Sequence, residues 1–319
     1  MTLNITDPEV IARLTNQAIP IDARQPIQVS TIEDEGTWQY DTVFYESVWP
    51  NGVSIPLVLR TYRSPITFWQ TQDSNKLSRE WAVLRRLRLD GFPAPRPVAH
   101  GEVNAHSFII WQAPAGQVWS DPAQAKPLIP HLADLLATLH TLDHNGLNNE
   151  PLYHATVAGS LVRMLLWSRE MGNEDLRQAI ARLKPAVAGL TSWPPKLLHG
   201  NPQLNNVIIE GGQITALVNW ANAAIGDPRW DVMTAAHGLR QIEAEWGEQL
   251  VNWYETLTGQ TIDKRPFWWA MVSVRLWALK AWTHHAVQSG FAPADFMHGA
   301  EDLAEAKTQA FDDLAAAGL

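Results

Sequence analysis

Two polar segments of the sequence carry side chains that could take part in chemistry. The first lies between apolar residues 197–198 and 207–209 and contains His199, Asn201 and Asn206. The second, further along the chain, contains Asn219, Asp227 and Asp231. Side-chain amides donate and accept hydrogen bonds, but they carry no charge and do not accept a proton at neutral pH. The sequence has no cysteine, which excludes thiol nucleophiles, thiolate metal sites and disulfides.

Both segments resemble motifs of the aminoglycoside phosphotransferase family, to which choline kinase-like proteins are related. The first, His199-Gly200-Asn201 followed by four residues and Asn206, resembles the family's catalytic loop, which typically starts His-Gly-Asp. The second, Val218-Asn219-Trp220 followed by Gly226-Asp227-Pro228 and Asp231, resembles its Ile-Asp-Trp and Gly-Asp-Pro stretch. The resemblance extends over residues 30–310. It implies an α+β, bilobal, protein-kinase-like fold with an antiparallel small lobe and a mostly helical large lobe.

The resemblance also implies roles for the two segments, and this chain departs from the family at both essential aspartates. The proton-accepting aspartate falls on Asn201, which with His199 forms a degenerate catalytic loop. The metal-binding aspartate falls on Asn219, which with Asn206 forms a degenerate metal site. Magnesium in phosphoryl-transfer sites is held mainly by carboxylates and phosphates. A missing general base costs about 10²–10⁴ in rate. We therefore expect a pseudokinase that binds ATP and magnesium weakly, if at all.

The small lobe resembles the family more loosely. Arg60 stands where the strand carries the phosphate-binding basic residue, and Glu80 stands where a helix supplies its partner. Trp111, Gln112 and Pro114 occupy the last strand and the hinge, where a nucleotide would contact the chain. Two alternatives stay open. Arg60 and Glu80 can form a surface ion pair of small value, and Trp111 can be ordinary core packing.

The phosphate loop of the family is nearly absent. Gly36 is the one glycine in its region, and acidic neighbours at 33–35 would repel a phosphate. This favours weak nucleotide binding.

Composition narrows the function classes further. The 319 residues include 24 basic and 33 acidic side chains, a net charge of −9, which argues against a general nucleic-acid binder. The sequence shows no signal peptide and no apolar stretch long enough to span a bilayer, so we expect a cytoplasmic protein without membrane contact.

Periodicity predicts the elements that position these residues. Strands are expected at 42–45, 55–60, 98–103 and 107–112, with an Asn-Gly hairpin between the first two. Helices are expected at 7–18, 75–89, 128–142, 157–169, 175–190, 235–257, 267–289 and 299–317. A loop and small hairpin interrupt the helices at 197–220. The predicted division is residues 1–112, the small lobe, and 113–319, the large lobe, which includes the catalytic-loop-like segment 197–231.

Three hypotheses for function remain open. The chain is a non-catalytic binder of a small molecule, in the interlobe or large-lobe cleft, or of a protein partner. Alternatively it is an active or weakly active ATP-dependent phosphotransferase with a hydroxyl acceptor. The third hypothesis is an interaction protein whose cleft is filled. Fold alone does not decide among them, and the two asparagines favour the first.

Overall fold

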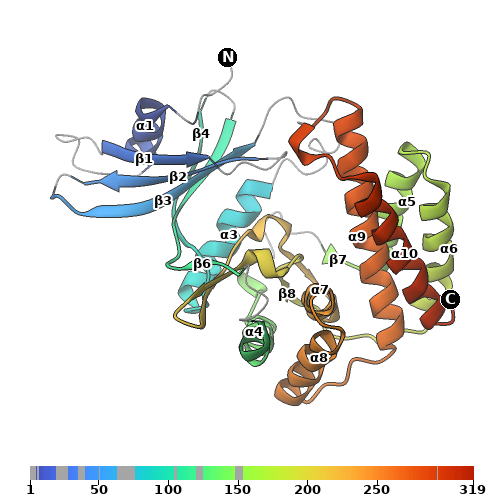
Figure 1. Cartoon of the computed structure of the whole chain (residues 1–319). Helices are drawn as coiled ribbons and strands as arrows, with labels where there is room; N and C mark the ends of the chain where they lie inside the picture. Colours follow the sequence, from blue (N-terminus) through green and yellow to red (C-terminus); the bar gives the residue numbers. More distant parts are fainter. Residues whose placement is uncertain are drawn as a thin grey trace.

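The N-terminal part of the chain is built on a five-stranded antiparallel sheet with strand order β1-β2-β3-β5-β4 (Figure 1). The structure, a computed structural model, describes residues 5, 7–18, 28–34, 40–49, 51–62, 76–103, 106–119, 125–147, 154–292 and 294–319. The strands are β1 (Gln28–Asp34), β2 (Tyr40–Val48), β3 (Ser54–Tyr62), β4 (Arg96–Val103) and β5 (His106–Gln112). The helices are α1 (Pro8–Ala18) and α3 (Lys76–Leu89). The strands and helices predicted for this part of the sequence are confirmed.

The predicted Asn-Gly hairpin joins β2 to β3. The N–H of Trp49 donates to the Val53 carbonyl at 2.9 Å, and that of Gly52 donates back to the Trp49 carbonyl at 2.8 Å. The Asn51 side chain accepts from the Val53 N–H. Gly52 has φ +80°, a left-handed conformation that glycine adopts without steric cost.

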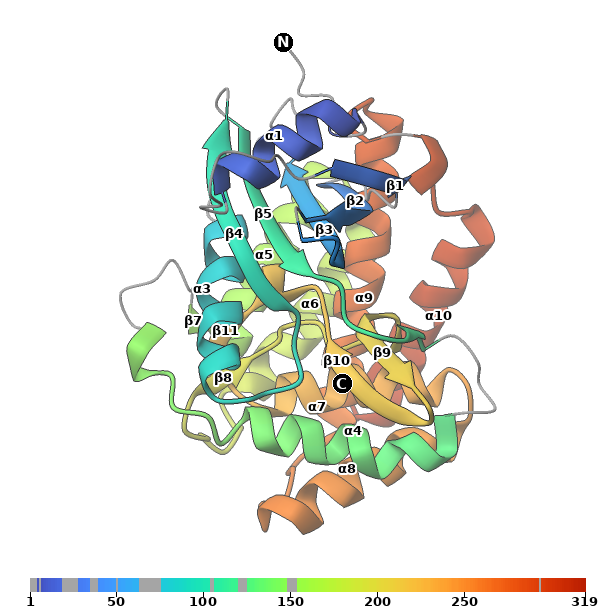
Figure 2. The same ribbon diagram turned by 90° about the vertical axis from the view of Figure 1, so that its left-hand side faces the viewer.

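Side-chain alternation along the sheet decides which residues face the rest of the molecule. Leu57 and Leu59 of β3 belong to a buried cluster with Ile11 and Leu14 of α1. Val58 belongs instead to the main core, which includes the buried face of α3. Figure 2 shows α1 and α3 on opposite sides of the sheet. Because successive side chains of a strand point to opposite faces, Arg60 shares the α3 face with Val58.

The C-terminal part is mostly helical (Figure 1). Its helices are α4 (Ala125–Leu139), α5 (Val157–Glu170), α6 (Glu174–Val187), α7 (Arg229–Arg240), α8 (Ala244–Thr258), α9 (Arg265–Gln288) and α10 (Ala300–Ala316). Five of these, α4, α5, α6, α9 and α10, follow the predicted helices with ends displaced by a few residues.

The single helix predicted over 235–257 is wrong. The chain forms two helices there, α7 and α8, because Glu243 adopts an extended conformation with φ −148° and ψ 125°. The second helix packs closely on the first at Gly247, where a Cβ would come within 2.7 Å of the Ala236 carbonyl oxygen. Residues 240–245 of the junction include no proline or glycine that would mark the break.

Two small three-stranded sheets interrupt the helices. One has the order β10-β9-β6 and the other β7-β11-β8. The first contains β6 (Gln117–Val118), β9 (Val207–Glu210) and β10 (Gln213–Leu217). The second contains β7 (His154–Ala155), β8 (Lys196–Leu198) and β11 (Ala224–Gly226). The predicted hairpin is thus confirmed as β9–β10, and the short β6, β7, β8 and β11 were not expected.

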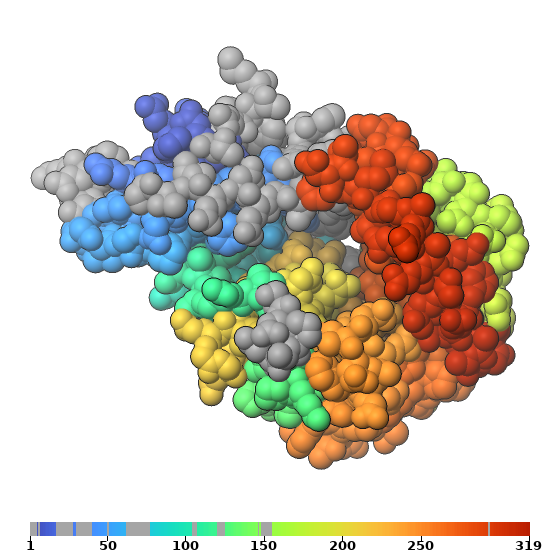
Figure 3. Space-filling model, in the orientation of Figure 1, coloured from blue at the N-terminus to red at the C-terminus, as the bar shows by residue number. Residues whose placement is uncertain are grey.

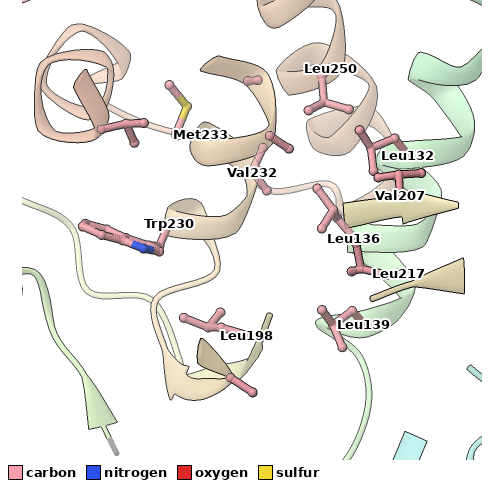
Figure 4. Packing of buried hydrophobic residues seen from close by; sticks show 14 of the residues in the cluster. Leu132, Leu136, Leu139, Leu198, Val207, Leu217, Trp230, Val232, Met233 and Leu250 are labelled. Carbon is pink, nitrogen blue, oxygen red and sulfur yellow. The ribbon is translucent and has the colours of Figure 1, made fainter. Parts of the chain in front are cut away.

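The main core holds the small sheets against the helices. Figure 4 shows Leu132, Leu136 and Leu139 of α4 beside Val207 and Leu217 of the β9–β10 hairpin. All five side chains are fully excluded from solvent. This packing fixes the segment between β8 and α7, which carries the polar residues singled out above.

The names small lobe and large lobe are used below for residues before and after position 112, and this division stays a prediction. Within the described ranges, no helix combines the length and apolar character required to cross a membrane.

Replacing Leu136 by alanine tests the role of the α4 core. Leu136 is 0% exposed, so the Leu136→Ala variant should lose about 2–5 kcal/mol of unfolding free energy. Leu89→Ala is the matched control, because Leu89 is 81% exposed and should change stability by less than about 0.5 kcal/mol. Urea unfolding of both variants measures the difference, and equal losses would contradict this packing.

Candidate functional site

A buried carboxylate positions the catalytic-loop-like segment. Asp231, in the first turn of α7, accepts the backbone N–H of His199 at 2.6 Å and that of Gly200 at 2.9 Å. Gly200 has φ +80°, and a Cβ there would overlap the Asn222 carbonyl oxygen. The loop therefore requires glycine at this position, and Asp231 fixes its backbone.

The ring of His199 is engaged in structural contacts. Its Nε2 lies 2.8 Å from the Val218 carbonyl oxygen, and its ring packs edge-on against Trp220 at 4.6 Å between centroids. Burial lowers the pKa of His199, although Asp231 and two backbone contacts oppose that shift. A neutral imidazole held in this way joins the loop to the end of β10.

The three asparagines singled out from the sequence form one hydrogen-bonded chain. Nδ2 of Asn219 donates to Oδ1 of Asn206 at 3.3 Å, and Nδ2 of Asn206 donates to the backbone oxygen of Asn201 at 2.9 Å. Asn219 adopts the left-handed conformation, with φ 69° and ψ 57°. The Asn201 Oδ1 atom is buried and has no hydrogen-bond partner in the described part of the chain.

Arg60 of the small lobe is hydrogen-bonded to this series of asparagines. Nη1 of Arg60 donates to both carboxylate oxygens of Glu80, at 3.2 and 3.1 Å, and to Oδ1 of Asn219 at 3.2 Å. Glu80 also accepts the backbone N–H of Trp220 at 3.1 Å. The ion pair is not at the surface, since the Arg60 and Glu80 side chains are 10% and 2% exposed. The two lobes are thus joined by direct hydrogen bonds.

Two aromatic rings enclose the Arg60 guanidinium. Its Cζ lies 5.0 Å from the Tyr40 ring centroid and 4.9 Å from that of Trp111. Trp111 is 4% exposed and belongs to the main core. Gln112 pairs with β3 and β4 at the end of β5, and Pro114 follows, half-buried. Contacts of these three residues with a nucleotide stay a prediction. Gly36 of the proposed phosphate loop lies outside the described residues.

Asp227, the second carboxylate of the segment that contains Asn219 and Asp231, forms an ion pair with Arg229. Asp227 accepts from Nη2 of Arg229 at 2.6 Å, and Nη1 of the same arginine donates to Asp263 at 2.5 Å. Among the described residues, no three His, Asp or Glu side chains are grouped as a metal site requires. The side-chain carbonyl oxygens of Asn206 and Asn219 each accept one hydrogen bond, from Asn219 Nδ2 and Arg60 Nη1 respectively.

A cavity of about 550 Å³ adjoins the loop on the large-lobe side. Asn201 belongs to its wall, together with His237 of α7 and Trp277 and Lys280 of α9. Figure 3 shows the surface hollowed between the yellow segment near residue 200 and the orange and red C-terminal helices. The sequence singled out Asn201 but not His237 or Lys280, because α7 and α9 are brought together only by tertiary packing.

Comparison with known proteins places the chain in a family. The family model described as phosphotransferase enzyme family matches residues 41–268. The chain belongs to this family. The sequence-based resemblance is thus confirmed at the level of family and fold.

Solved structures of similar fold have low sequence identity to the chain. A thermostable mutant of an aminoglycoside phosphotransferase aligns with a TM-score of 0.64 at 14% identity, covering 91% of this chain and 95% of that one. A choline/ethanolamine kinase family protein from Mesorhizobium loti aligns with a TM-score of 0.63 at 16% identity, covering 98% and 99%. These alignments support the bilobal kinase-like fold.

The curated relatives are named acyl-CoA dehydrogenase family member 11. The Rattus norvegicus protein is 24% identical over 182 residues, which is 50% of this chain and 22% of that protein. The Homo sapiens protein is 25% identical over 183 residues, with the same coverage. The match therefore spans about a fifth of the length of these relatives.

Two glycines with positive φ allow a test of the loop geometry. Gly200→Ala should destabilise the protein by more than about 3 kcal/mol, because strain adds to overlap with the Asn222 carbonyl. Gly172→Ala, at φ +63° with open space around its Cβ, should cost about 1 kcal/mol. Thermal unfolding compares the two, and similar losses would argue against the close approach at Gly200.

The buried His237 gives a pH dependence of stability. Burial lowers its pKa from 6.5 to about 4, with Arg240 and Lys280 lowering it further and Asp313 opposing them. Below pH 6.5 the His237 imidazole binds a proton in the unfolded protein, but in the folded protein it stays neutral down to about pH 4. The free energy of unfolding should therefore fall by about 3 kcal/mol, through this residue, as the pH is lowered from 6.5 to 4. His237→Gln should remove that part of the loss. The control is His131→Gln, at an exposed histidine, and this variant should show the same loss of stability at low pH as the wild type.

Proposed function

We propose that this chain binds a small molecule on a phosphotransferase scaffold and no longer transfers phosphate efficiently. The observation that carries the proposal is the hydrogen bond from Asn219 Nδ2 to Asn206 Oδ1. In the family resemblance these two positions hold the metal. Here an amide N–H group points at the oxygen that would face the cation, and the pair is satisfied without one.

The donor set does not fit magnesium. This ion prefers octahedral oxygen coordination with carboxylates and phosphates, whereas Asn206 and Asn219 offer two neutral carbonyl oxygens that already accept hydrogen bonds. The nearby Glu80 carboxylate is occupied by Arg60 and Trp220. Asp231 accepts two backbone N–H groups of the loop. Neither of these two carboxylates is therefore free to supply the charge that Asn206 and Asn219 lack.

Proton acceptance is also weakened. Asn201 stands where the family resemblance places the catalytic base, and an amide does not take a proton from a hydroxyl at neutral pH. Loss of a general base costs about 10²–10⁴ in rate, or roughly 3–5 kcal/mol of barrier. The two asparagines act on one transition state, so their effects are not additive.

Retained ligand binding is supported by the cavity beside Asn201. Its volume of about 550 Å³ falls in the usual range for small-molecule sites. The wall combines polar side chains with Trp277 and leucines. A cavity of this size open to one side of the loop favours a small molecule over a protein partner.

Back-substitution tests the proposal. The double variant Asn201→Asp, Asn219→Asp returns a hard anionic ligand beside Asn206 and a proton acceptor in the loop. Its melting temperature should rise by about 5 °C or more with ATP and magnesium near 100-fold above Kd. The wild type should show no magnesium-dependent rise. Differential scanning fluorimetry with and without chelator measures this.

The matched control is the double variant Gln178→Glu, Gln288→Glu, which adds the same two negative charges at exposed positions outside the loop and the cavity. It should behave as the wild type does. A magnesium-dependent rise in the wild type, or ATP consumption by it at a rate near that of the double variant, would contradict lost transfer and favour an active phosphotransferase.

A further inference from the structure

The solvent-facing side of α3 carries an arginine-rich stripe next to β4. Trp81, Arg85 and Arg88 follow one another at four- and three-residue spacing, so they lie along one side of the helix. Leu89 comes one turn after Arg85 and extends this side, and these four residues are called the α3 stripe below. Figure 2 shows α3 beside β4, the edge strand of the sheet. Trp81 stacks on His100 of β4, with 5.7 Å between the ring centroids.

The arginines of the stripe have no acidic partner in the described part of the chain. Asp90, the acidic residue that follows the stripe, accepts two hydrogen bonds from Arg86, at 2.9 and 3.1 Å. Arg85 and Arg88 are exposed, and neither forms an ion pair among the described residues. The Arg85 guanidinium lies instead over the Trp81 ring, with its Cζ 5.9 Å from the centroid. Both guanidinium groups are therefore available to carboxylates from outside the chain, which they can bind in a bidentate manner.

A highly exposed leucine lies beside these arginines. Leu89 is 81% exposed, the highest fraction of the large apolar side chains in the described ranges. A single exposed leucine needs no explanation by itself. Here, however, it shares one side of a helix with arginine and tryptophan, the residue types that are enriched in protein–protein contact surfaces.

The charge of this region is opposite to that of the whole chain. Residues 76–103 contain six basic and three acidic residues, whereas the complete sequence has a net charge of −9. Arg79 and Glu80 of this segment are buried and bind backbone groups of the large lobe. Arg96, the first residue of β4, is exposed and adds to the positive charge at the surface. The local field therefore attracts acidic groups, although the protein as a whole repels them.

We propose that the α3 stripe binds an acidic amphipathic helix of another protein. The carboxylates of the partner pair with Arg85 and Arg88, and its apolar side chains cover Leu89 and the half-buried Trp81 ring. From Trp81 to Leu89 the stripe is about 12 Å long, which corresponds to about two turns of a partner helix. None of these residues lines the large-lobe cavity, so the proposal does not depend on the proposed function.

A protein partner is favoured over an anionic membrane. Membrane-binding segments carry clusters of about four to eight basic residues. The exposed arginines of this region without a carboxylate partner are Arg85, Arg88 and Arg96, and the chain as a whole is acidic.

Model peptides test the charge preference on the full chain. One labelled helical peptide of about 15 residues carries leucines on one side and glutamates on the other, and a matched peptide carries glutamine in place of glutamate. Fluorescence anisotropy in about 0.15 M salt, where distant charges are largely screened, measures both Kd values. The net charge of −9 alone favours the glutamine peptide. The stripe predicts the reverse order, with the glutamate peptide binding about fivefold or more tightly.

Three results of this comparison would overturn the proposal. They are equal Kd values for the two peptides, tighter binding of the glutamine peptide, and no binding of the glutamate peptide up to about 1 mM.

Charge reversal in the stripe locates the binding. The double variant Arg85→Glu, Arg88→Glu should weaken binding of the glutamate peptide by about fivefold or more. The double variant Arg169→Glu, Lys184→Glu makes the same change of charge at exposed positions of α5 and α6, and it should change the Kd by less than about twofold. Both variants should fold, because all four side chains are exposed. Equal effects of the two variants would contradict binding at α3.

Leu89→Ala tests the apolar contact separately from the charge. It should weaken binding of the glutamate peptide by about threefold or more, while the midpoint of urea unfolding stays that of the wild type. Val162→Ala, at a residue of α5 that is 58% exposed, is the control and should leave the Kd unchanged. An unchanged Kd for Leu89→Ala would overturn an amphipathic partner.

Vesicles of phosphatidylserine and phosphatidylcholine distinguish a protein partner from a membrane. The full chain should not sediment with these vesicles in about 0.15 M salt. Sedimentation that the variant Arg85→Glu, Arg88→Glu abolishes would overturn the proposal and assign the stripe to a lipid surface.

Discussion

The buried carboxylate of Glu80 is the interaction on which the two-lobed arrangement depends. It accepts hydrogen bonds from Arg60 of β3 and from the backbone of Trp220 in the large lobe, and its side chain is 2% exposed. Removing one partner of a buried ion pair leaves an uncompensated charge, which is far more costly than losing a surface pair. Glu80 therefore ties the sheet, α3 and the segment after β10 to one another.

A series of hydrogen bonds connects Arg60, the partner of Glu80, to the large lobe. Arg60 donates to Asn219, Asn219 to Asn206, and Asn206 to the backbone of Asn201. Each link uses an amide where the family resemblance implies a carboxylate or a metal ligand. These hydrogen bonds between side chains and backbone hold the segments of the two lobes together.

Much of the fold was predictable because its signals are local. The Asn-Gly turn and the helices with periodic apolar residues have signals that lie close together in the sequence. The break between α7 and α8 was missed because no glycine or proline lies between Arg240 and Ala244, although Glu243 is extended in the structure. Predicting β6, β7 and β11 was not possible because strands of two or three residues exist only through their pairing partners.

The candidate site was also predictable only in part from the sequence. Asn201, Asn206 and Asn219 were identified from the resemblance to the two family motifs, and hydrogen bonds connect them in the structure. Their direct hydrogen bonds to one another and to Arg60 were not predicted, because these depend on side-chain placement across the lobes. His237 carried no sequence signal, since a single histidine on a helix is indistinguishable from a core residue until the cavity is formed.

Calorimetric titration of the wild-type chain with ATP, in the presence and absence of magnesium, most directly tests whether hydrogen bonds have replaced the cation in this site. If Asn206 and Asn219 satisfy each other as the structure shows, binding should be weak, and its Kd should change by less than about threefold, or 0.7 kcal/mol, when magnesium is added. Tight ATP binding that requires magnesium would contradict the account.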